Sequence, residues 1–431
     1  MLGCFSFPAN MKNSQVKKTT LDNGLVILSE TINYVRSVSL GIWVCAGSQH
    51  ETAKENGISH FIEHAVFKGT KERTSRQIAL QADLLGGGLD AFTSQDVTHY
   101  YIKALDSHLP KAFDLLADIV TNPTFSETEL EKERSVILEE IKMVDDTPDE
   151  LVYDLFASSF WSNHSLGRPI QGTAESVSNF SRAMVVDYFN KIYHPKNILI
   201  VATGNVNHEH LVDLAYRYFA HLKAGNYLPI ETAPQINYQV TVHKKRSLEQ
   251  THIILGAKAP TLVAPERYAS SILSNILGGG LSSRLFQTIR EEHGLAYNVF
   301  SSIEAFRHTA CLSIYLAVSN QQVRKAIDYV LQEINNLKEI PISEEELSAT
   351  KEQIKTSLLL SADSISGRMS SLAQNEIFFG REISLDEIIS EISQVKIEQV
   401  QELAQDIFQK DKLAITILSS NDKTKLDLNS L

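Results

Sequence analysis

The sequence predicts an α+β protein built from two structurally similar domains, each a mainly antiparallel sheet packed with helices. The chain has 431 residues, of which 43% are hydrophobic, and this is enough for two or more ordinary domains with cores. One order of helix-forming and strand-forming segments occurs twice along the chain. Segments rich in alternating β-branched and aromatic residues mark the strands.

The helical part of the repeat is clearest in two long segments. The first, "KAFDLLADIVTNPTFSETELEKERSVILEEI", begins at Lys111, and the second, "KAIDYVLQEINNLKEIPISEEELSATKEQIKTSLL", begins at Lys325. Each predicts an amphipathic helix, a turn that contains proline, a Ser-x-x-Glu-Leu helix start and a second long helix. Upstream of them, "HFIEHAVFKGT" and "SILSNILGGGL" lie at a similar offset.

The strand-forming segments repeat in the same order. "AFTSQDVTHYYIKAL" in the first half corresponds to "YNVFSSIEAFRHTACLSIYLAV" in the second, and the halves end in "NILIVATG" and "LAITILSS". The opening segment "TTLDNGLVILSE" holds Asp22-Asn23-Gly24, a typical hairpin turn. The sheets are therefore expected to be mainly antiparallel.

The repeat divides the chain into an N-terminal extension at 1–18, a first domain at 19–222, a linker at 223–239 and a second domain at 240–431. Gly225, Pro229 and Pro234 interrupt the linker, which has no helical periodicity. The first eighteen residues lack the pattern of a secretion signal or a mitochondrial presequence, and Met11 is an alternative start. No run approaches eighteen apolar residues, so no membrane span is expected.

The charge balance limits the partners. The chain has 52 Asp and Glu residues against 40 Lys and Arg, which argues against a broad nucleic-acid surface and suits cations or basic ligands. Cys4, Cys45 and Cys311 are far apart and form no CxxC pair, so neither a disulfide framework nor a thiolate metal site is expected. A reducing compartment such as the cytoplasm fits this usage best.

The stretch "HFIEH" predicts a metal site on a helix. His60 and His64 are one turn apart and share a face, which is the spacing at which two imidazoles hold one zinc ion. Glu63 points roughly the same way and could accept a proton from a bound water. On these five residues alone, a helix with a hydrogen-bonded histidine pair and no metal is an equal alternative.

A catalytic zinc ion needs a third protein ligand, and "EKERSVILEEIKMV" offers two candidates. Glu133 and Glu140 are seven residues apart and share a helical face with Val136, Ile137 and Val144. A carboxylate on an apolar stripe needs a partner, because burying it unpaired is costly. A metal ion would supply that partner.

The internal repeat separates function from packing. The second half keeps the apolar frame but replaces every candidate metal residue, with Ser271, Ser274, Asn275, Thr350 and Ser357 at the corresponding positions. This asymmetry favours a functional role for the residues of the first half.

Taken with its surroundings, the motif resembles a known family. "HFIEH", 75 intervening residues and then Glu140 are similar to the HxxEH…E signature of the inverted zinc peptidases, the pitrilysin family. "NGISHFIEHAVFKGT", "ERSVILEEIKM" and "HSLGRPIQGT" resemble the branch of bacterial processing peptidases and the mitochondrial processing peptidase β subunit. The resemblance implies that His60, His64 and Glu140 bind one zinc ion per chain, that Glu63 is the general base and that Glu133 supports the site. It also favours a bacterial cytoplasmic protein.

The second half contributes "IREEHGLAY", in which Arg290 and Tyr297 are seven apart, as in the family's Arg…Tyr pair. A guanidinium and a phenol are donors suited to a peptide carbonyl and its developing oxyanion. The alternative is a surface arginine on a helix and a tyrosine in the core. Because the candidate zinc ligands and the Arg/Tyr pair stand on the same chain, we expect this chain to be active without a partner chain.

Two further segments resemble substrate-binding parts of the family. Glu150 and Asp154 in "DTPDELVYD" resemble an acidic pair that holds an arginine near the cut, with a solvated acidic helix start as the alternative. "GGGLDAFTS" resembles the edge strand to which a peptide adds as an extra strand, which implicates Ala91 and Phe92. This chain has Asp90 where family members usually carry Asn.

These observations predict a zinc endopeptidase whose halves enclose a peptide as a clamshell, with short or unfolded peptides as substrates and basic residues favoured near the cut. We expect peptide partners, no nucleic acid and no membrane; a homodimer is left open. One alternative is a non-catalytic scaffold, like the core subunits of a respiratory complex that share this fold. Another is an active half that requires a partner chain.

Overall fold

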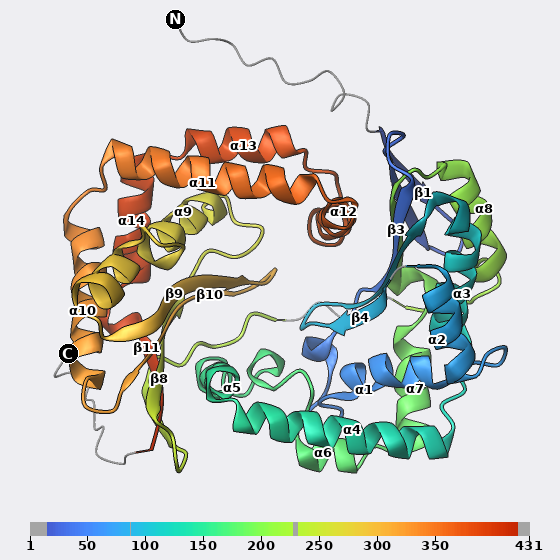
Figure 1. The fold of residues 1–431 in the computed structure, drawn as a ribbon, viewed down its shortest axis with the longest axis horizontal. Helices are drawn as coiled ribbons and strands as arrows, with labels where there is room; N and C mark the ends of the chain where they lie inside the picture. The colour runs from blue at the N-terminus through green and yellow to red at the C-terminus, as the bar shows by residue number, and fades with distance from the viewer. Residues whose placement is uncertain (1–14, 87, 227–231, 421–431) are drawn as a thin grey trace, which may run out of the picture. The chain divides into compact units, whose positions relative to one another are not determined.

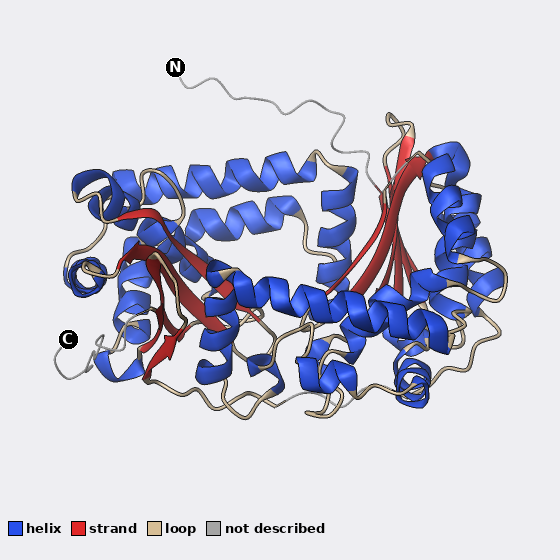
Figure 2. Cartoon of the chain, turned by 60° about the horizontal axis from the view of Figure 1, so that its bottom comes forward, coloured by secondary structure: helices blue, strands red, loops and turns tan. Residues whose placement is uncertain are grey.

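The computed structural model describes residues 15–86, 88–226 and 232–420 and has two mixed sheets packed with helices (Figures 1 and 2). This confirms the predicted α+β class with two structurally similar parts. Most of the N-terminal extension predicted at 1–18, including the alternative start Met11, and part of the linker predicted at 223–239 lie outside the described residues. No helix in the described part of the chain combines the length and the apolar character that a membrane crossing requires.

The first sheet has six strands in the order β1-β2-β6-β3-β5-β4. Its strands are β1 (Gln15–Thr20), β2 (Val26–Thr31), β3 (Ser37–Val44), β4 (Leu89–Thr93), β5 (Thr98–Leu105) and β6 (Ile198–Gly204). Only β2 and β6 pair in parallel, and the other neighbours are antiparallel. The hairpin predicted at 22–24 joins β1 to β2, and Gly24 takes the positive φ of 91° that favours glycine.

The second sheet has five strands in the order β7-β11-β8-β10-β9. Its strands are β7 (Val240–Lys244), β8 (Gln250–Lys258), β9 (Ala296–Ala305), β10 (Ala310–Ser319) and β11 (Ala414–Ser419). Here β7 and β11 pair in parallel, and the remaining pairs are antiparallel. Both sheets are therefore mainly antiparallel, as expected.

The helices follow the repeat read from the sequence. In the first half they are α1 (Ile58–Ala65), α2 (Ser75–Leu84), α3 (Leu109–Thr121), α4 (Glu127–Asp146), α5 (Pro148–Phe160), α6 (Ala174–Ser178), α7 (Arg182–Ile192) and α8 (His208–Phe219). In the second half they are α9 (Arg267–Gly278), η7 (Phe286–Glu292), α10 (Val323–Glu339), α11 (Glu344–Ala362), α12 (Ile365–Phe379), α13 (Leu385–Gln394) and α14 (Ile397–Ile407). The pairs α3–α4 and α10–α11 are the two helix pairs that the repeat predicts.

The two compact units of the structure do not coincide with the two halves of the sequence, because each unit contains a segment from the other half. The first unit takes its described residues from 1–138, 170–230 and 361–382, and the second from 139–169, 231–360 and 383–431. The first unit thus includes α12 from the second half, and the second includes α5 from the first half. The division at 19–222 and 240–431 stays a prediction of where the repeat lies.

In the first unit, α12 covers one face of the sheet. Met369 and Leu372 pack with Trp43, Leu199 and Val201, whose side chains share that face. Helices α3 and α8 contact the same sheet and lie on its other face (Figure 1). The first sheet is buried on both faces only because a helix from the far end of the chain covers it.

In the second unit, α5 covers one face of the second sheet in the same way. Its residues Val152, Phe156 and Phe160 are spaced four apart, share a helical face and pack against Ile254 and Tyr315 of the second sheet. The opposite face of that sheet packs against helices of its own half, among them α9, α10 and α14.

Candidate active site

Helix α1 presents the polar residues of "HFIEH" on its less buried face. Ile58, Phe61, Ile62 and Ala65 are buried in the core, whereas His60, Glu63 and His64 are half-buried on the other side. The helix begins after Gly57, which has a φ of +94° and no room for a Cβ, since that atom would lie 2.6 Å from the carbonyl oxygen of Gln171. Glycine at this position sets where the helix starts.

A buried carboxylate holds the start of α1. Glu51 is only 4% exposed, and its two oxygens accept backbone N–H groups of Gly57 at 2.7 Å and Ser59 at 2.8 Å. These are amides that a helix leaves without internal partners at its first turn. Burial raises the pKa of Glu51 to about 7, against the hydrogen bonds from Ser59 and Gly57, which lower it.

The structure brings three predicted ligands together. One ligand atom each from His60, His64 and Glu140 lies within 4.8 Å of the other two. Glu140 stands on α4, which runs unbroken from Glu127 to Asp146. Two imidazoles and one carboxylate are the donor set of many catalytic zinc sites. The residues present therefore fit a zinc ion.

His60 is in the protonation state that a metal requires. Burial, together with the neighbouring His64, lowers the pKa of His60 to about 4, so its ring is neutral at pH 7. A neutral imidazole has a lone pair available for coordination.

Glu133 connects His64 to a lysine. One carboxylate oxygen of Glu133 lies 3.3 Å from Nδ1 of His64, and the other lies 2.9 Å from Nζ of Lys68. Burial alone would raise the pKa of Glu133, but its hydrogen bonds to His64 and Lys68 outweigh burial and lower that pKa. An ionised carboxylate only accepts, so Nδ1 of His64 donates and Nε2 is left to face a metal.

Glu63 is held from the first sheet. Its Oε2 accepts a hydrogen bond of 2.5 Å from Oγ1 of Thr93, the last residue of β4. The strand also carries Ala91 and Phe92 and forms an edge of its sheet, since it pairs only with β5 among the described strands. Phe92 is 47% exposed, and Oδ2 of Asp90 accepts from the hydroxyl of Tyr101 at 2.9 Å.

The Arg/Tyr pair lies at the junction of η7 and β9 in the second unit. Nη1 of Arg290 donates to the carbonyl oxygen of Tyr297 at 3.0 Å, and the guanidinium lies 4.5 Å from the centre of the tyrosine ring. Tyr297 is 73% exposed, so the alternative of a core tyrosine is wrong. The structure places both donors together, with the phenol open to a ligand.

Glu150 and Asp154 stand one turn apart on α5. Burial, with the nearby charges of Asp145 and Glu150, raises the pKa of Asp154 to about 6. Neither side chain has an ion-pair partner among the described residues. The repulsion expected from their spacing is therefore present.

Sequence reasoning missed three residues of this site: Glu51, Lys68 and Thr93. Lys68 is four residues after His64, and this spacing could have pointed to it. Thr93 lies 30 residues beyond Glu63, and no periodicity links the two. Glu51 precedes α1 in a non-helical segment, so no periodic pattern in the sequence predicts its contact with the start of the helix.

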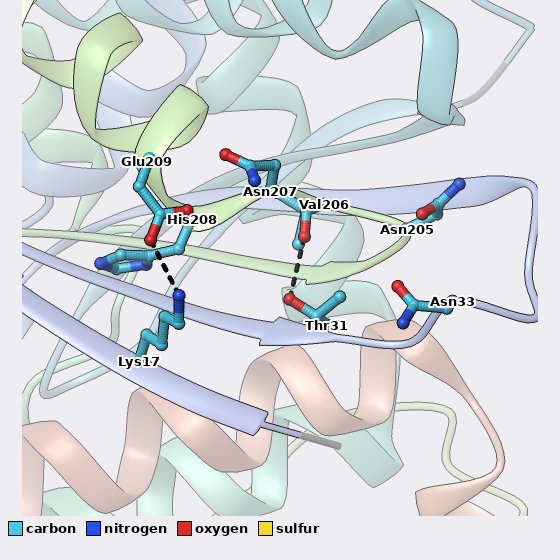
Figure 3. A pocket seen from close by; sticks show the side chains of 8 residues that line it. All are labelled: Lys17, Thr31, Asn33, Asn205, Val206, Asn207, His208 and Glu209. Carbon is cyan, nitrogen blue, oxygen red and sulfur yellow. Dashed lines mark hydrogen bonds and ion pairs between the residues drawn. The ribbon is translucent and has the colours of Figure 1, made fainter. Parts of the chain in front are cut away.

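A pocket of about 310 Å³ lies near the start of α8 (Figure 3) and shares no lining residue with the ligand cluster. Lys17 pairs there with Glu209 at 2.8 Å. His208, the first residue of α8, has its ring nitrogens 2.8 Å from the hydroxyl oxygens of Ser29 and Thr19. These contacts give His208 a structural role.

Two family models match the chain. The model described as insulinase (peptidase family M16) matches residues 26–174, which include the ligand cluster. The model described as the peptidase M16 inactive domain matches residues 179–354, which include Arg290 and Tyr297. The halves with and without the metal residues thus correspond to separate family models.

Relatives of similar length are named as zinc proteases. The uncharacterized zinc protease YmxG of Bacillus subtilis (strain 168) is 39% identical over 404 residues, or 94% of this chain and 98% of that protein. An uncharacterized zinc protease of Rickettsia felis is 36% identical over 392 residues, or 90% of this chain and 94% of that protein.

Solved structures share the fold. A protease from Helicobacter pylori superposes with a TM-score of 0.88 at 23% identity, over 94% of this chain and 99% of that chain. A chain of Complex III2 from Candida albicans, with Inz-5 bound, has a TM-score of 0.85 at 22% identity, over 96% and 98%. These structures establish the shared fold, whereas the sequence relatives establish the family through their higher identity over most of the chain. As its motifs predicted, the chain belongs to the insulinase family, peptidase family M16.

Proposed function

We propose that this chain is a zinc metalloendopeptidase that binds one zinc ion and hydrolyses short or unfolded peptides. The observation that carries the proposal is the convergence of His60, His64 and Glu140, with Glu63 on the same helix as the two histidines. Three protein ligands that leave a fourth position for water are typical of catalytic zinc sites. The names of the bacterial relatives support the choice of metal.

The residues of the chain have separate tasks in this reaction. When bound, zinc supplies Lewis-acid activation of water and of the substrate carbonyl. Glu63 takes the proton of the attacking water as the new C–O bond forms, and gives it to the amine nitrogen as the C–N bond breaks. Glu133 keeps His64 in the tautomer that directs Nε2 away from the carboxylate.

The substrate peptide is proposed to add to the free edge of β4. Such pairing uses main-chain hydrogen bonds and requires an extended segment, which favours short or unfolded chains over folded proteins. Ala91 and Phe92 would then contact the peptide. The exposure of Phe92 and the edge position of β4 support this role.

Arg290 and Tyr297 are proposed to donate hydrogen bonds to the substrate carbonyl. The exposed phenol and the contact of Arg290 with the Tyr297 carbonyl support the idea. Tyr297→Phe should lower kcat by about tenfold or more while zinc content stays at one per chain. Wild-type kcat in this variant would remove Tyr297 from the mechanism.

Glu150 and Asp154 are proposed to give the enzyme a preference for arginine or lysine near the cleaved peptide bond. Their mutual repulsion and the raised pKa of Asp154 mark a place where a cation would be stabilised. Glu150→Gln should reduce cleavage of an arginine peptide relative to its glutamine counterpart. The exposed Glu139 offers a matched control, Glu139→Gln, which should leave that ratio unchanged.

Two alternatives remain to be compared with this proposal. The fold is shared with a chain of Complex III2 from Candida albicans, and fold alone does not fix function. The ligand cluster favours a peptidase over a scaffold, and the presence of Arg290 and Tyr297 on the same chain favours activity without a partner. Mass and activity of the purified chain separate a self-sufficient enzyme from one that needs a second chain.

We also propose that the protein works in a reducing compartment such as the cytoplasm. The cysteines Cys45 and Cys311 are free thiols, and this supports the proposal.

The deciding experiment combines metal analysis with cleavage of a quenched peptide that contains arginine, for the wild type and for Glu63→Gln. One zinc per chain in both proteins, with cleavage by the wild type alone, would support the site and the base together. Protein that takes up no zinc and stays inactive after reconstitution would favour the scaffold.

A further inference from the structure

We propose that Thr93 is a positioning residue, which holds the carboxylate of Glu63 from the edge strand where the peptide is proposed to bind. The inference rests on the proposed peptidase function and assigns a role to a residue for which the sequence motifs suggested none. Its consequence is that one strand, β4, both receives the substrate and orients the base.

The contact itself is short and involves a charge. Oγ1 of Thr93 donates to Oε2 of Glu63 at 2.5 Å, and both side chains are half-buried. Hydrogen bonds to a carboxylate are roughly twice as strong as those between neutral groups. A donor fixed on one oxygen restricts rotation of the carboxylate, and this also fixes the direction of the other oxygen.

The direction of the Thr93 side chain follows from the strand. Successive residues of a strand point to opposite faces, so Ala91 and Thr93 share one face of β4, and Asp90 and Phe92 share the other. Helix α1 packs against β4. Thr93 therefore faces the helix that carries Glu63, while Asp90 meets Tyr101 on the opposite face.

The backbone holds this end of β4 in place. The turn after the strand accepts two N–H groups from the segment that follows β3, Ser48 to the carbonyl of Ser94 at 3.1 Å and Gln49 to that of Gln95 at 3.0 Å. The approach is close at Gly47, where a Cβ would lie 2.1 Å from the Ser94 oxygen.

The same segment also holds the start of α1. Two residues beyond Gln49, the buried Glu51 accepts the N–H groups of Gly57 and Ser59. Residues 48 to 51 thus connect to both partners of the hydrogen bond, the end of β4 and the start of α1. This shared anchor fixes the spacing between Thr93 and Glu63 before any ligand binds.

The arrangement relates the base to the substrate strand. A peptide paired with the edge of β4 takes its register from that strand, and Thr93 ties Glu63 to the same strand. The base is thereby oriented relative to the peptide and not only to the histidines of α1. Loss of the hydroxyl should thus impair proton transfer in the bound complex more than peptide binding.

Thr93→Val and Thr93→Ser form a matched pair for the test, because valine keeps the shape and serine keeps the hydroxyl. In zinc-loaded protein we expect Thr93→Val to lower kcat by about 10- to 100-fold, as expected for a lost hydrogen bond to a charged group, with KM within about threefold of the wild type. Thr93→Ser should stay within about threefold of wild-type kcat, given the retained donor. Zinc content should be one per chain in each.

A second readout needs no activity. In metal-free protein, Thr93→Val should lower the urea midpoint of the wild type but change it much less in a Glu63→Ala background, because the partner is gone. Equal shifts in both backgrounds, or wild-type kcat in Thr93→Val, would overturn the positioning role. If Thr93→Val is normal while Glu63→Gln is inactive, this inference fails and the proposed function stands; a zinc-loaded wild type that cleaves nothing overturns both.

Discussion

Glu133 and His64 are joined by a contact of 3.3 Å between Oε2 and Nδ1, and the other oxygen of Glu133 meets Lys68 at 2.9 Å. The three residues form a chain from a candidate ligand to a buried carboxylate and a lysine. Glu133 is 5% exposed, so its negative charge depends on these partners. The metal-binding strength of His64 should therefore depend on a residue that does not itself bind the metal.

Glu133→Gln should weaken zinc binding by about 10- to 100-fold, because the amide is a weaker acceptor for Nδ1–H and no longer fixes the tautomer. Competition with a chromophoric chelator measures this directly. Glu139→Gln, an exposed change on the same helix, is the matched control and should leave zinc affinity unchanged. Equal affinities for wild type and Glu133→Gln would contradict the role of this contact.

Glu51 should make stability fall as pH rises. Burial raises its pKa from 4.5 to about 7 in the folded state, so the folded protein holds a proton that the unfolded chain has already lost. The stabilisation is complete below pH 4.5 and disappears as pH rises through 7. At about 1.4 kcal/mol per pKa unit, the loss is at most about 3.5 kcal/mol.

Urea unfolding of metal-free wild type and Glu51→Gln between pH 5 and pH 8 measures this contribution. The difference in unfolding free energy between the two proteins should be largest at the acidic end and shrink toward pH 8. A difference that does not vary with pH would show that Glu51 titrates normally.

Local patterns were sufficient to predict much of the fold and of the candidate site. The i, i+4 spacing of His60 and His64 fixes their common face on any helix, and the repeat predicted both helix pairs. Contacts between distant segments could not be predicted in this way. The bond from Thr93 to Glu63 depends on where β4 lies against α1, and no periodicity encodes that placement.

The sequence could not predict that α5 and α12 each cover the sheet of the other half, for a related reason. Amphipathic spacing shows that a helix has an apolar face, but not which sheet covers that face. Phe156 packs on the second sheet and Leu372 on the first, each on the sheet of the other sequence half. The division of the chain into two halves did not anticipate this exchange.

Leu372→Ala should destabilise the first unit, although the residue belongs to the second half of the sequence. Leu372 is 6% exposed and packs with Trp43 and Leu199, so truncation should cost about 2–4 kcal/mol. Hydrogen exchange should show lost protection in β6 before β8 or β11. The exposed Leu360 provides the control Leu360→Ala, which should change little. Loss of protection confined to the second sheet would contradict the packing of α12.

His99 should make the protein sensitive to acid. Its ring is 2% exposed and stacks between Trp43 at 3.8 Å and Tyr101 at 4.8 Å, and burial lowers its pKa to about 3. Below pH 6.5 the unfolded chain binds a proton at His99, whereas the folded chain does not. The contribution of His99 to stability is therefore present above pH 6.5 and is lost as pH falls toward 3. By pH 5 the loss is about 2 kcal/mol, at about 1.4 kcal/mol per unit.

His99→Phe keeps the stacking and removes the titrating group, so its stability relative to the wild type should rise as pH falls from 7.5 to 5. Urea unfolding of metal-free protein at both pH values measures the change. His210→Gln alters an exposed histidine and should leave the wild-type pH dependence in place. If His99→Phe shows the same loss of stability in acid as the wild type, the acid sensitivity must come from other buried histidines, such as His50 and His60, whose pKa values are also lowered by burial.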